Sequence, residues 1–336
     1  MIIKEQNRIS VRRLLVSLFA LVLLIILLTF FIDVKSVYNQ LRHANGMALL
    51  AGSSLLILGY VAYAIRWQTL MEKKPRLLPT FHASNVGNMA NTLLPVRPGD
   101  PLRIFLLGKS EKTPLLEVTS SVVVERWFEQ IMRLAAFGGA VVFGAGGAVS
   151  QTTILGSVAF LVIMLAFMLW MIKRQDLVLA RFPAWLARIP RLTEARARQG
   201  LNDLLDGLQS ISSVRRMSIT LVLSIITWGL FWGFHYLCLM AIDSTLPQNT
   251  RLALSLGSLS LVPPSATTVP GVYQLSMVLP LALIGYDEET LTAYSIIMNA
   301  TEMIWIIFLG LLGMFHSGLT WRQLSGQKPQ ELIEKG

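Results

Sequence analysis

Charge is scarce in this sequence of 336 residues, since Asp, Glu, Lys and Arg together make up 14% of it. An average soluble domain has about 25%. Hydrophobic residues make up 54%, so a soluble globule of this composition would expose large apolar patches. Cysteine is nearly absent, because Cys238 is the only one and it lies inside an apolar run. These shortages exclude a disulfide framework and a cysteine-based zinc site.

The sequence also lacks the motifs of the common enzyme classes. Its four histidines are scattered without an H-E-x-x-H pattern, and no Walker A, G-x-S-x-G or D-x-D motif is present. We therefore expect no metal, no cofactor and no catalytic residue of these classes. The net charge is +10, but the basic residues stand between apolar runs. That placement fits anionic lipid headgroups better than nucleic acid, for which no binding is expected.

Six apolar runs are long enough to cross a bilayer. They are residues 14–32, 47–67, 114–146, 154–172, 218–242 and 289–315. The first run follows basic residues, as a signal peptide would, but it is too long and no cleavage pattern follows, so we expect a retained anchor. The sequence thus predicts an all-α polytopic membrane protein of about six transmembrane helices. Residues 1–320 form a single integral-membrane domain, and residues 321–336 form a tail.

Basic residues gather on alternate connections between these runs. The connector 173–216 contains nine Lys or Arg against four Asp or Glu, and the stretch 72–112 and both terminal tails are basic too. The positive-inside rule places all of them in the cytoplasm, with both termini. The connector is amphipathic in places, so we expect it to lie on the cytoplasmic leaflet. The expected location is the bacterial cytoplasmic (inner) membrane.

Two further apolar stretches, residues 81–103 and 252–285, are rich in residues that interrupt helices. Non-helical backbone at membrane depth is tolerated only where protein buries it or where it lines a watery cavity. We predict that both are re-entrant segments that enter from opposite sides, a pattern typical of a transporter's central site. The alternative is a pair of interfacial loops.

Four ionisable residues lie near the middle of the run 114–146: Glu125, Arg126, Glu129 and Arg133. Ionisable groups inside a membrane are costly and are functional candidates by default. Arg126 can meet Glu129 at the i+3 position, so the group either neutralises itself or leaves an arginine facing an anionic ligand. Glu302, in the middle of the last run, is either the partner of one of these arginines or a ligand-binding group.

The stretch 94–103 carries Arg97, Asp100 and Arg103 around a Pro-Gly turn. Guanidinium groups offer a planar fork of donors that suits phosphate, and Asp100 is within reach of either arginine. Asn88 and Asn91 belong to a polar stripe that recurs every three residues. We expect Arg97, Arg103 and Arg126 to converge on a headgroup, because nearby acids are too few to pair them all. The alternative is a basic loop that only follows the positive-inside rule.

These residues form recognisable motifs. The first is N-x-x-L-P-x-R-x-G-[ED]-x-x-R, met by Asn91, Leu94, Pro95, Arg97, Gly99, Asp100 and Arg103. The second is a Glu-Arg pair with an acid on the next turn, met by Glu125, Arg126 and Glu129. Together with the late Pro-rich hairpin, they resemble the family of lysylphosphatidylglycerol-synthase-like transmembrane domains, a flippase-like membrane module. The resemblance covers nearly the whole chain.

A third motif of that family, P-x-x-P-G-x-x-G-x-x-E, is met only in part. Pro264 and Gly271 match, whereas Thr267 and Thr268 replace Pro-Gly and Gln274 replaces the acid. The departure speaks against a proton-linked or cation-pairing role at position 274. We expect the membrane half of the family's architecture without the synthase half, because the sequence ends soon after the last run.

The resemblance implies handling of a phospholipid or a polyprenyl-phosphate-linked lipid. We favour a transporter or flippase that passes an anionic headgroup through a polar cavity, possible partners being membrane lipids and a lipid-synthesis enzyme. The alternative is an integral-membrane enzyme or enzyme partner in envelope lipid or glycolipid synthesis. The residues expected to contact the lipid are Asn88, Asn91, Arg97, Asp100, Arg103, Glu125, Arg126, Glu129, Thr268, Gly271 and Gln274.

Overall fold

The computed structural model describes residues 44–72, 74–94, 98–144, 174–186, 214–261, 272–282 and 286–318, with the single positions 42, 170, 194 and 198. Its helices are α3 (Gly46–Thr69), α4 (Leu77–Leu93), α5 (Gly99–Glu111), α6 (Leu115–Gly144), α8 (Gln175–Leu186), α10 (Val214–Ile242), α11 (Gln248–Leu261), α12 (Val272–Ala282) and α13 (Glu288–Ser317). No strand occurs in these ranges, and the predicted all-α class is confirmed. The predicted runs 14–32 and 154–172 lie outside the described residues, as do most of the connector and the tail.

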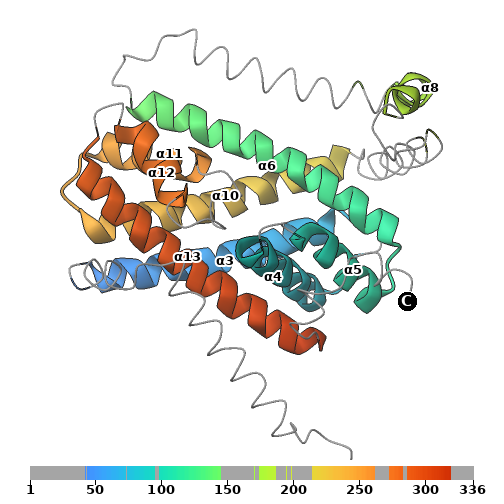
Figure 1. The fold of residues 1–336 in the computed structure, drawn as a ribbon, viewed down its shortest axis with the longest axis horizontal. Coiled ribbons are helices and arrows are strands. Elements are labelled where there is room, and N and C mark those ends of the chain that lie inside the picture. Colours follow the sequence, from blue (N-terminus) through green and yellow to red (C-terminus); the bar gives the residue numbers. More distant parts are fainter. Residues whose placement is uncertain are drawn as a thin grey trace, which may run out of the picture.

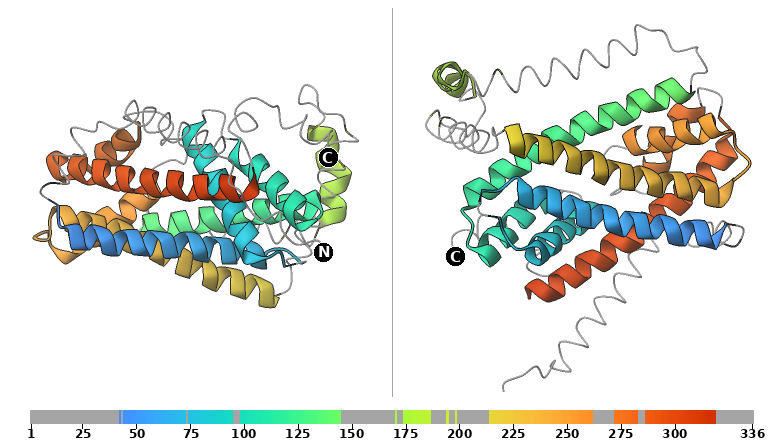
Figure 2. Two further views of the ribbon diagram at one scale, coloured as in Figure 1. Left: turned by 90° about the horizontal axis from the view of Figure 1, so that it is seen from below. Right: turned by 180° about the vertical axis from the view of Figure 1, so that it is seen from behind.

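Three of the described helices are long and apolar enough to cross a membrane: α3, Arg215–Ile242 within α10, and α13. They coincide with three of the predicted runs. A fourth run forms α6, whose 30 residues span about 45 Å at 1.5 Å per residue. In Figures 1 and 2, α3 and α10 run side by side, α6 lies along α11, and α13 crosses the short helix α4.

The ends of the long helices are fixed by capping groups. The Asn45 side chain accepts hydrogen bonds from the backbone N–H of Met47 at 3.0 Å and of Ala48 at 3.2 Å, where α3 begins. The N–H of Asn45 also donates to the carbonyl of Ala241 at 2.7 Å, which joins the start of α3 to the end of α10. Asp287 caps α13 by accepting from the N–H of Thr290 at 2.7 Å. Such caps satisfy backbone donors that a helix terminus leaves open.

The first interrupted segment folds as a helix, a break and a second helix. Asn91 on α4 accepts a hydrogen bond from the N–H of Gly99, the first residue of α5, at 2.8 Å. A Cβ atom on Gly99 would stand 2.0 Å from the carbonyl oxygen of Gly87, so only glycine allows the two backbones this approach. The Asn91 side chain thus supplies the polar partner that the backbone at the start of α5 needs.

The second interrupted segment has a looser arrangement. Its first part is α11, which packs against α6 and α10, and its last part is α12, which packs mainly against α13. The break between them, with Thr268 and Gly271, lies outside the described residues. The two segments therefore both contain helices, but their entry from opposite membrane faces stays a prediction.

Candidate functional site

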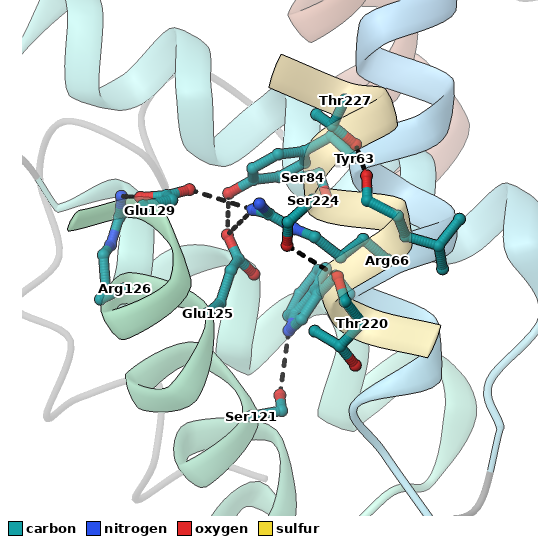
Figure 3. Close-up of polar contacts among 12 residues, drawn as sticks. Tyr63, Arg66, Ser84, Ser121, Glu125, Arg126, Glu129, Thr220, Ser224 and Thr227 are labelled. Atoms are coloured by element: carbon teal, nitrogen blue, oxygen red, sulfur yellow. Dashed lines mark hydrogen bonds and ion pairs between the residues drawn. The ribbon is translucent and has the colours of Figure 1, made fainter. Parts of the chain in front are cut away.

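A network of buried charges joins α3, α5 and α6. We name it the paired cluster, and its members are Tyr63, Arg66, Asp100, Arg103, Glu125, Arg126 and Glu129. Glu125 lies at its centre with no exposed surface. It accepts a hydrogen bond from the Tyr63 hydroxyl, and Arg103 Nη1 donates to its two oxygens at 3.1 and 3.2 Å. Figure 3 shows Glu125 turned toward Tyr63.

Arg126 lies between two carboxylates. Its Nη2 atom is 2.5 Å and 2.8 Å from the two oxygens of Asp100, and its Nε is 3.2 Å from the second of them. Its Nη1 donates to Glu129 at 2.6 Å, the i+3 contact expected from the sequence. Asp100 also lies 3.1 Å from Nε of Arg103. A bidentate fork of this kind fixes the guanidinium plane as well as its position.

Arg66 completes the cluster from α3, and the sequence analysis did not single it out. Its Nη2 lies 3.2 Å from Glu129 and 3.6 Å from Glu125. Its side chain is 1% exposed, and its Nε and Nη1 have no hydrogen-bond partner in the part of the chain that the structure describes. Arg66 stands one residue before the end of the run 47–67, where positive charge is ordinary, so its position alone carried no signal.

Charges within the paired cluster balance. Three guanidinium groups (Arg66, Arg103, Arg126) face three carboxylates, so the expectation of too few acids is wrong for Arg103 and Arg126. Arg103 is 1% exposed and also lies over the Trp67 ring, with its guanidinium carbon 4.8 Å from the ring centroid. Its contacts make it a counter-ion for Glu125. Arg97 lies outside the described residues.

A cavity of about 250 Å³, lined by both charged and apolar side chains, adjoins this cluster. Of the predicted site residues, Asn88, Asn91, Arg126 and Glu129 line it. Gln274 follows the lining residue Tyr273, and the Gln274 side-chain oxygen is buried and has no hydrogen-bond partner among the described residues. The remaining wall includes Arg133 and Glu302, which the sequence analysis named as ionisable candidates. It also includes residues that the sequence analysis did not single out as candidates, namely Tyr60, Arg66, Trp228, Phe231, His235, Ser258 and Tyr273.

Comparison with known families decides the class of the protein. The family described as "Lysylphosphatidylglycerol synthase TM region" matches residues 14–310. The chain belongs to this family. It is therefore an integral membrane protein of a family linked to lipid handling, and the cavity lies within the matched region. No curated protein and no solved structure matches the chain.

Two acids line the described cavity of this family member, Glu129 of the paired cluster and Glu302. Glu302 of α13 lines the cavity and is partly accessible there. It lies close enough to Tyr60 of α3 and Tyr273 of α12 to interact with both hydroxyl groups electrostatically. No ion pair within the described part of the chain includes Glu302. The possibility that it pairs with an arginine of α6 is therefore not realised in this structure.

A chain of hydrogen bonds links three helices beside the cavity. His235 Nδ1 of α10 lies 2.7 Å from the Ser258 hydroxyl of α11, which lies 2.8 Å from the Tyr294 hydroxyl of α13. All three residues are buried, and His235 and Ser258 line the cavity. Within the described residues, no group of three or more His, Cys, Asp or Glu could hold a metal ion.

Proposed function

We propose that the protein moves a membrane lipid with an anionic, phosphate-bearing headgroup between the two leaflets. The observation that carries this proposal is a cavity with charged and hydrogen-bonding groups in its wall, to which three helices apolar enough to span a membrane contribute. Polar and ionisable groups at that depth are expensive and mark a pathway for polar cargo. At about 250 Å³ the cavity suits a headgroup, while the acyl chains stay in the surrounding lipid.

Arg126 is the group best placed to bind the phosphate. It lines the cavity and keeps 36% of its side-chain surface exposed, whereas Arg103 is closed off. Asp100 and Glu129 hold its plane in place, and a guanidinium has five N–H donors with which to receive a further anion. We propose that the phosphate joins Arg126 by taking over part of the bonding now made by Glu129.

The remaining predictions become parts of this proposal. We place the protein in the bacterial cytoplasmic membrane with both termini in the cytoplasm, next to the enzymes that synthesise its lipid. An enzyme that acts on a nucleotide-sugar donor would favour a D-x-D motif, which the sequence does not contain, so we keep transport as the single proposed function.

Reconstitution tests the proposal. The purified protein is placed in vesicles of phosphatidylglycerol and phosphatidylethanolamine with a trace of fluorescent phosphatidylglycerol, and dithionite reports the label that reaches the outer leaflet. We expect faster exchange than in protein-free vesicles. Arg126→Lys keeps the charge but loses the fork, and should slow exchange about tenfold, the equivalent of one charge-assisted hydrogen bond.

Arg76→Lys is the matched control, because Arg76 is an exposed arginine paired with Glu111 away from the cavity. It should exchange lipid at the rate of the unaltered protein. Lipid movement no faster than in empty vesicles would overturn the proposal. Full activity of both Arg126→Lys and Arg97→Lys would leave transport standing but remove recognition of phosphate by these guanidinium groups.

A further inference from the structure

Glu302 is an acid whose charge nothing in the described structure compensates. It stands in the middle of α13, one of the helices able to span the membrane, and its carboxylate borders the cavity. No cation lies within ion-pair distance of it among the described residues. A lone carboxylate in such surroundings must acquire a proton, a cation or water. The three carboxylates of the paired cluster have no such need.

The groups that lie near Glu302 or share the cavity wall with it form no ion pair with it among the described residues. α3, α10 and α12 present weak acids and a histidine, and the arginines of the wall belong to α3 and α6. These groups are Tyr60, Cys238, His235 and Tyr273, with Arg66 of α3 and Arg126, Glu129 and Arg133 of α6. Arg66 and Arg126 are engaged by the carboxylates of the paired cluster. Arg133 has contacts of its own, including a hydrogen bond to the carbonyl of Ser260 at 3.4 Å.

A chain of groups that can exchange protons adjoins the same cavity. It begins at His235 and Ser258 on the cavity wall and ends at the buried hydroxyl of Tyr294. Each member has a group that can both donate and accept a proton. The cavity has room for several water molecules, so water can join this chain to Glu302.

We propose that Glu302 is a proton-binding site that couples lipid movement to a proton gradient. The inference rests on the proposed lipid transport. A proton from the chain or from water forms an O–H bond with one carboxylate oxygen of Glu302, and the side chain becomes neutral. The same bond breaks when the site meets the opposite solution, where water takes the proton. Each cycle therefore carries one proton and changes the charge of the cavity by one unit.

Protonation of Glu302 shifts the equilibrium between a wet and a dry form of the cavity, because the charged and the neutral carboxyl group require different surroundings. The neutral acid tolerates a closed apolar contact with the rings of Tyr60, Tyr273 and Phe231, whereas the anion requires water. A protein with a wet and a dry form of the cavity shifts toward the dry form when Glu302 binds a proton. The paired cluster keeps its charges in both forms, so it can hold the phosphate while Glu302 responds to the gradient.

The test uses the vesicles described above, prepared with a pH difference of one unit across the membrane and with a fluorescent dye trapped inside to report proton uptake. One proton per lipid then drives a steady-state difference of about tenfold in labelled phosphatidylglycerol between the leaflets, because one pH unit is worth about 1.4 kcal/mol. We expect this asymmetry, and coupled proton flux, with the unaltered protein.

Three variants isolate the carboxylate. Glu302→Gln cannot titrate, so labelled lipid should reach equal amounts in both leaflets or stop moving, and proton flux should cease. Glu302→Asp keeps a titratable acid and should retain the asymmetry at a lower rate. Glu289→Gln removes an exposed acid from the first turn of the same helix and should behave as the unaltered protein. Thermal unfolding in detergent identifies a variant that fails to fold.

The other outcomes overturn the proposal in distinguishable ways. Lipid movement without asymmetry or proton flux would leave transport intact and refute the coupling. Loss of movement only for amine-bearing fluorescent phosphatidylethanolamine in Glu302→Gln would show that Glu302 binds a headgroup ammonium instead. If no lipid moves at all, the proposed function fails, and infrared spectroscopy still decides the proton site. We expect a protonated carboxyl band that disappears at alkaline pH and is missing from Glu302→Gln; a spectrum without such a band refutes it.

Discussion

The paired cluster and Glu302 differ in how their buried charge is neutralised. In the paired cluster every carboxylate contacts at least one guanidinium, and Glu125 contacts two guanidinium groups and a tyrosine hydroxyl. Glu302, which lines the cavity, has no such partner among the described residues. A buried ion pair is stable because removal of either member leaves the other as an unpaired buried charge. A lone acid, by contrast, can bind and release the proton or cation that neutralises it. Neighbouring acids in one cavity therefore serve different purposes.

The largest effect is expected at Glu125. Glu125→Gln removes the acceptor charge beneath Arg103 and Arg66 and should lower the free energy of unfolding by about 3–5 kcal/mol, the cost of breaking a buried ion pair. Glu302→Gln should change it by less than about 1 kcal/mol, because it breaks no pair. Equilibrium unfolding in detergent measures both. Equal losses of unfolding free energy in Glu125→Gln and Glu302→Gln would contradict the proposed difference between the paired cluster and Glu302.

Glu117→Gln serves as the matched control for this comparison. Glu117 is a partly exposed acid in the first turn of the same helix as Glu125, and its amide counterpart can still accept the hydrogen bond from the N–H of Glu72. We expect a change within about 0.5 kcal/mol.

A medium effect is expected where α4 and α5 cross. Gly99→Ala places a Cβ atom 2.0 Å from the carbonyl oxygen of Gly87, so the helices must separate. α5 carries Asp100 and Arg103, and overpacking here should cost about 1–3 kcal/mol and loosen the paired cluster. Gly138→Ala is the control, because a Cβ there meets nothing described within 4 Å and alanine favours helix by up to about 1 kcal/mol. Equal stability of both variants would contradict the close crossing.

The smallest effect is expected at the start of α13, the helix that carries Glu302. Hydrogen bonds from the backbone N–H and the side chain of Thr290 hold the pKa of Asp287 below its ordinary value. A lowered pKa stabilises the fold above the unfolded-state pKa of about 3.9. That stabilisation disappears as the pH falls through the still lower folded-state pKa. Asp287→Ala should unfold at a slightly lower temperature near neutral pH and should show a weaker loss of stability on acidification. Identical acid profiles would exclude the cap's contribution.

The long helices and the charged motifs were predictable because each depends on local sequence. Apolar runs predicted α3, α10 and α13, and the i+3 spacing predicted the pairing of Arg126 with Glu129. Arg66 was not predictable, because only the packing of α3 against α6 brings it to residues more than 50 positions away. The pairing of Arg103 with Glu125 was hidden for the same reason, and so was the close approach of Gly87 to Gly99.

The order of the paired cluster along the chain has a consequence for its biosynthesis. Tyr63, Arg66, Asp100 and Arg103 all precede Glu125 in the sequence, and a chain is synthesised from its N-terminus. α6, with four ionisable residues near its middle, would be a poor helix to insert into lipid by itself. It emerges from the ribosome only after the side chains that neutralise Glu125 have been made. The charges of α6 can therefore be paired while α6 inserts into the membrane. If the same segments were synthesised in another order, α6 would have to insert with its charges unpaired.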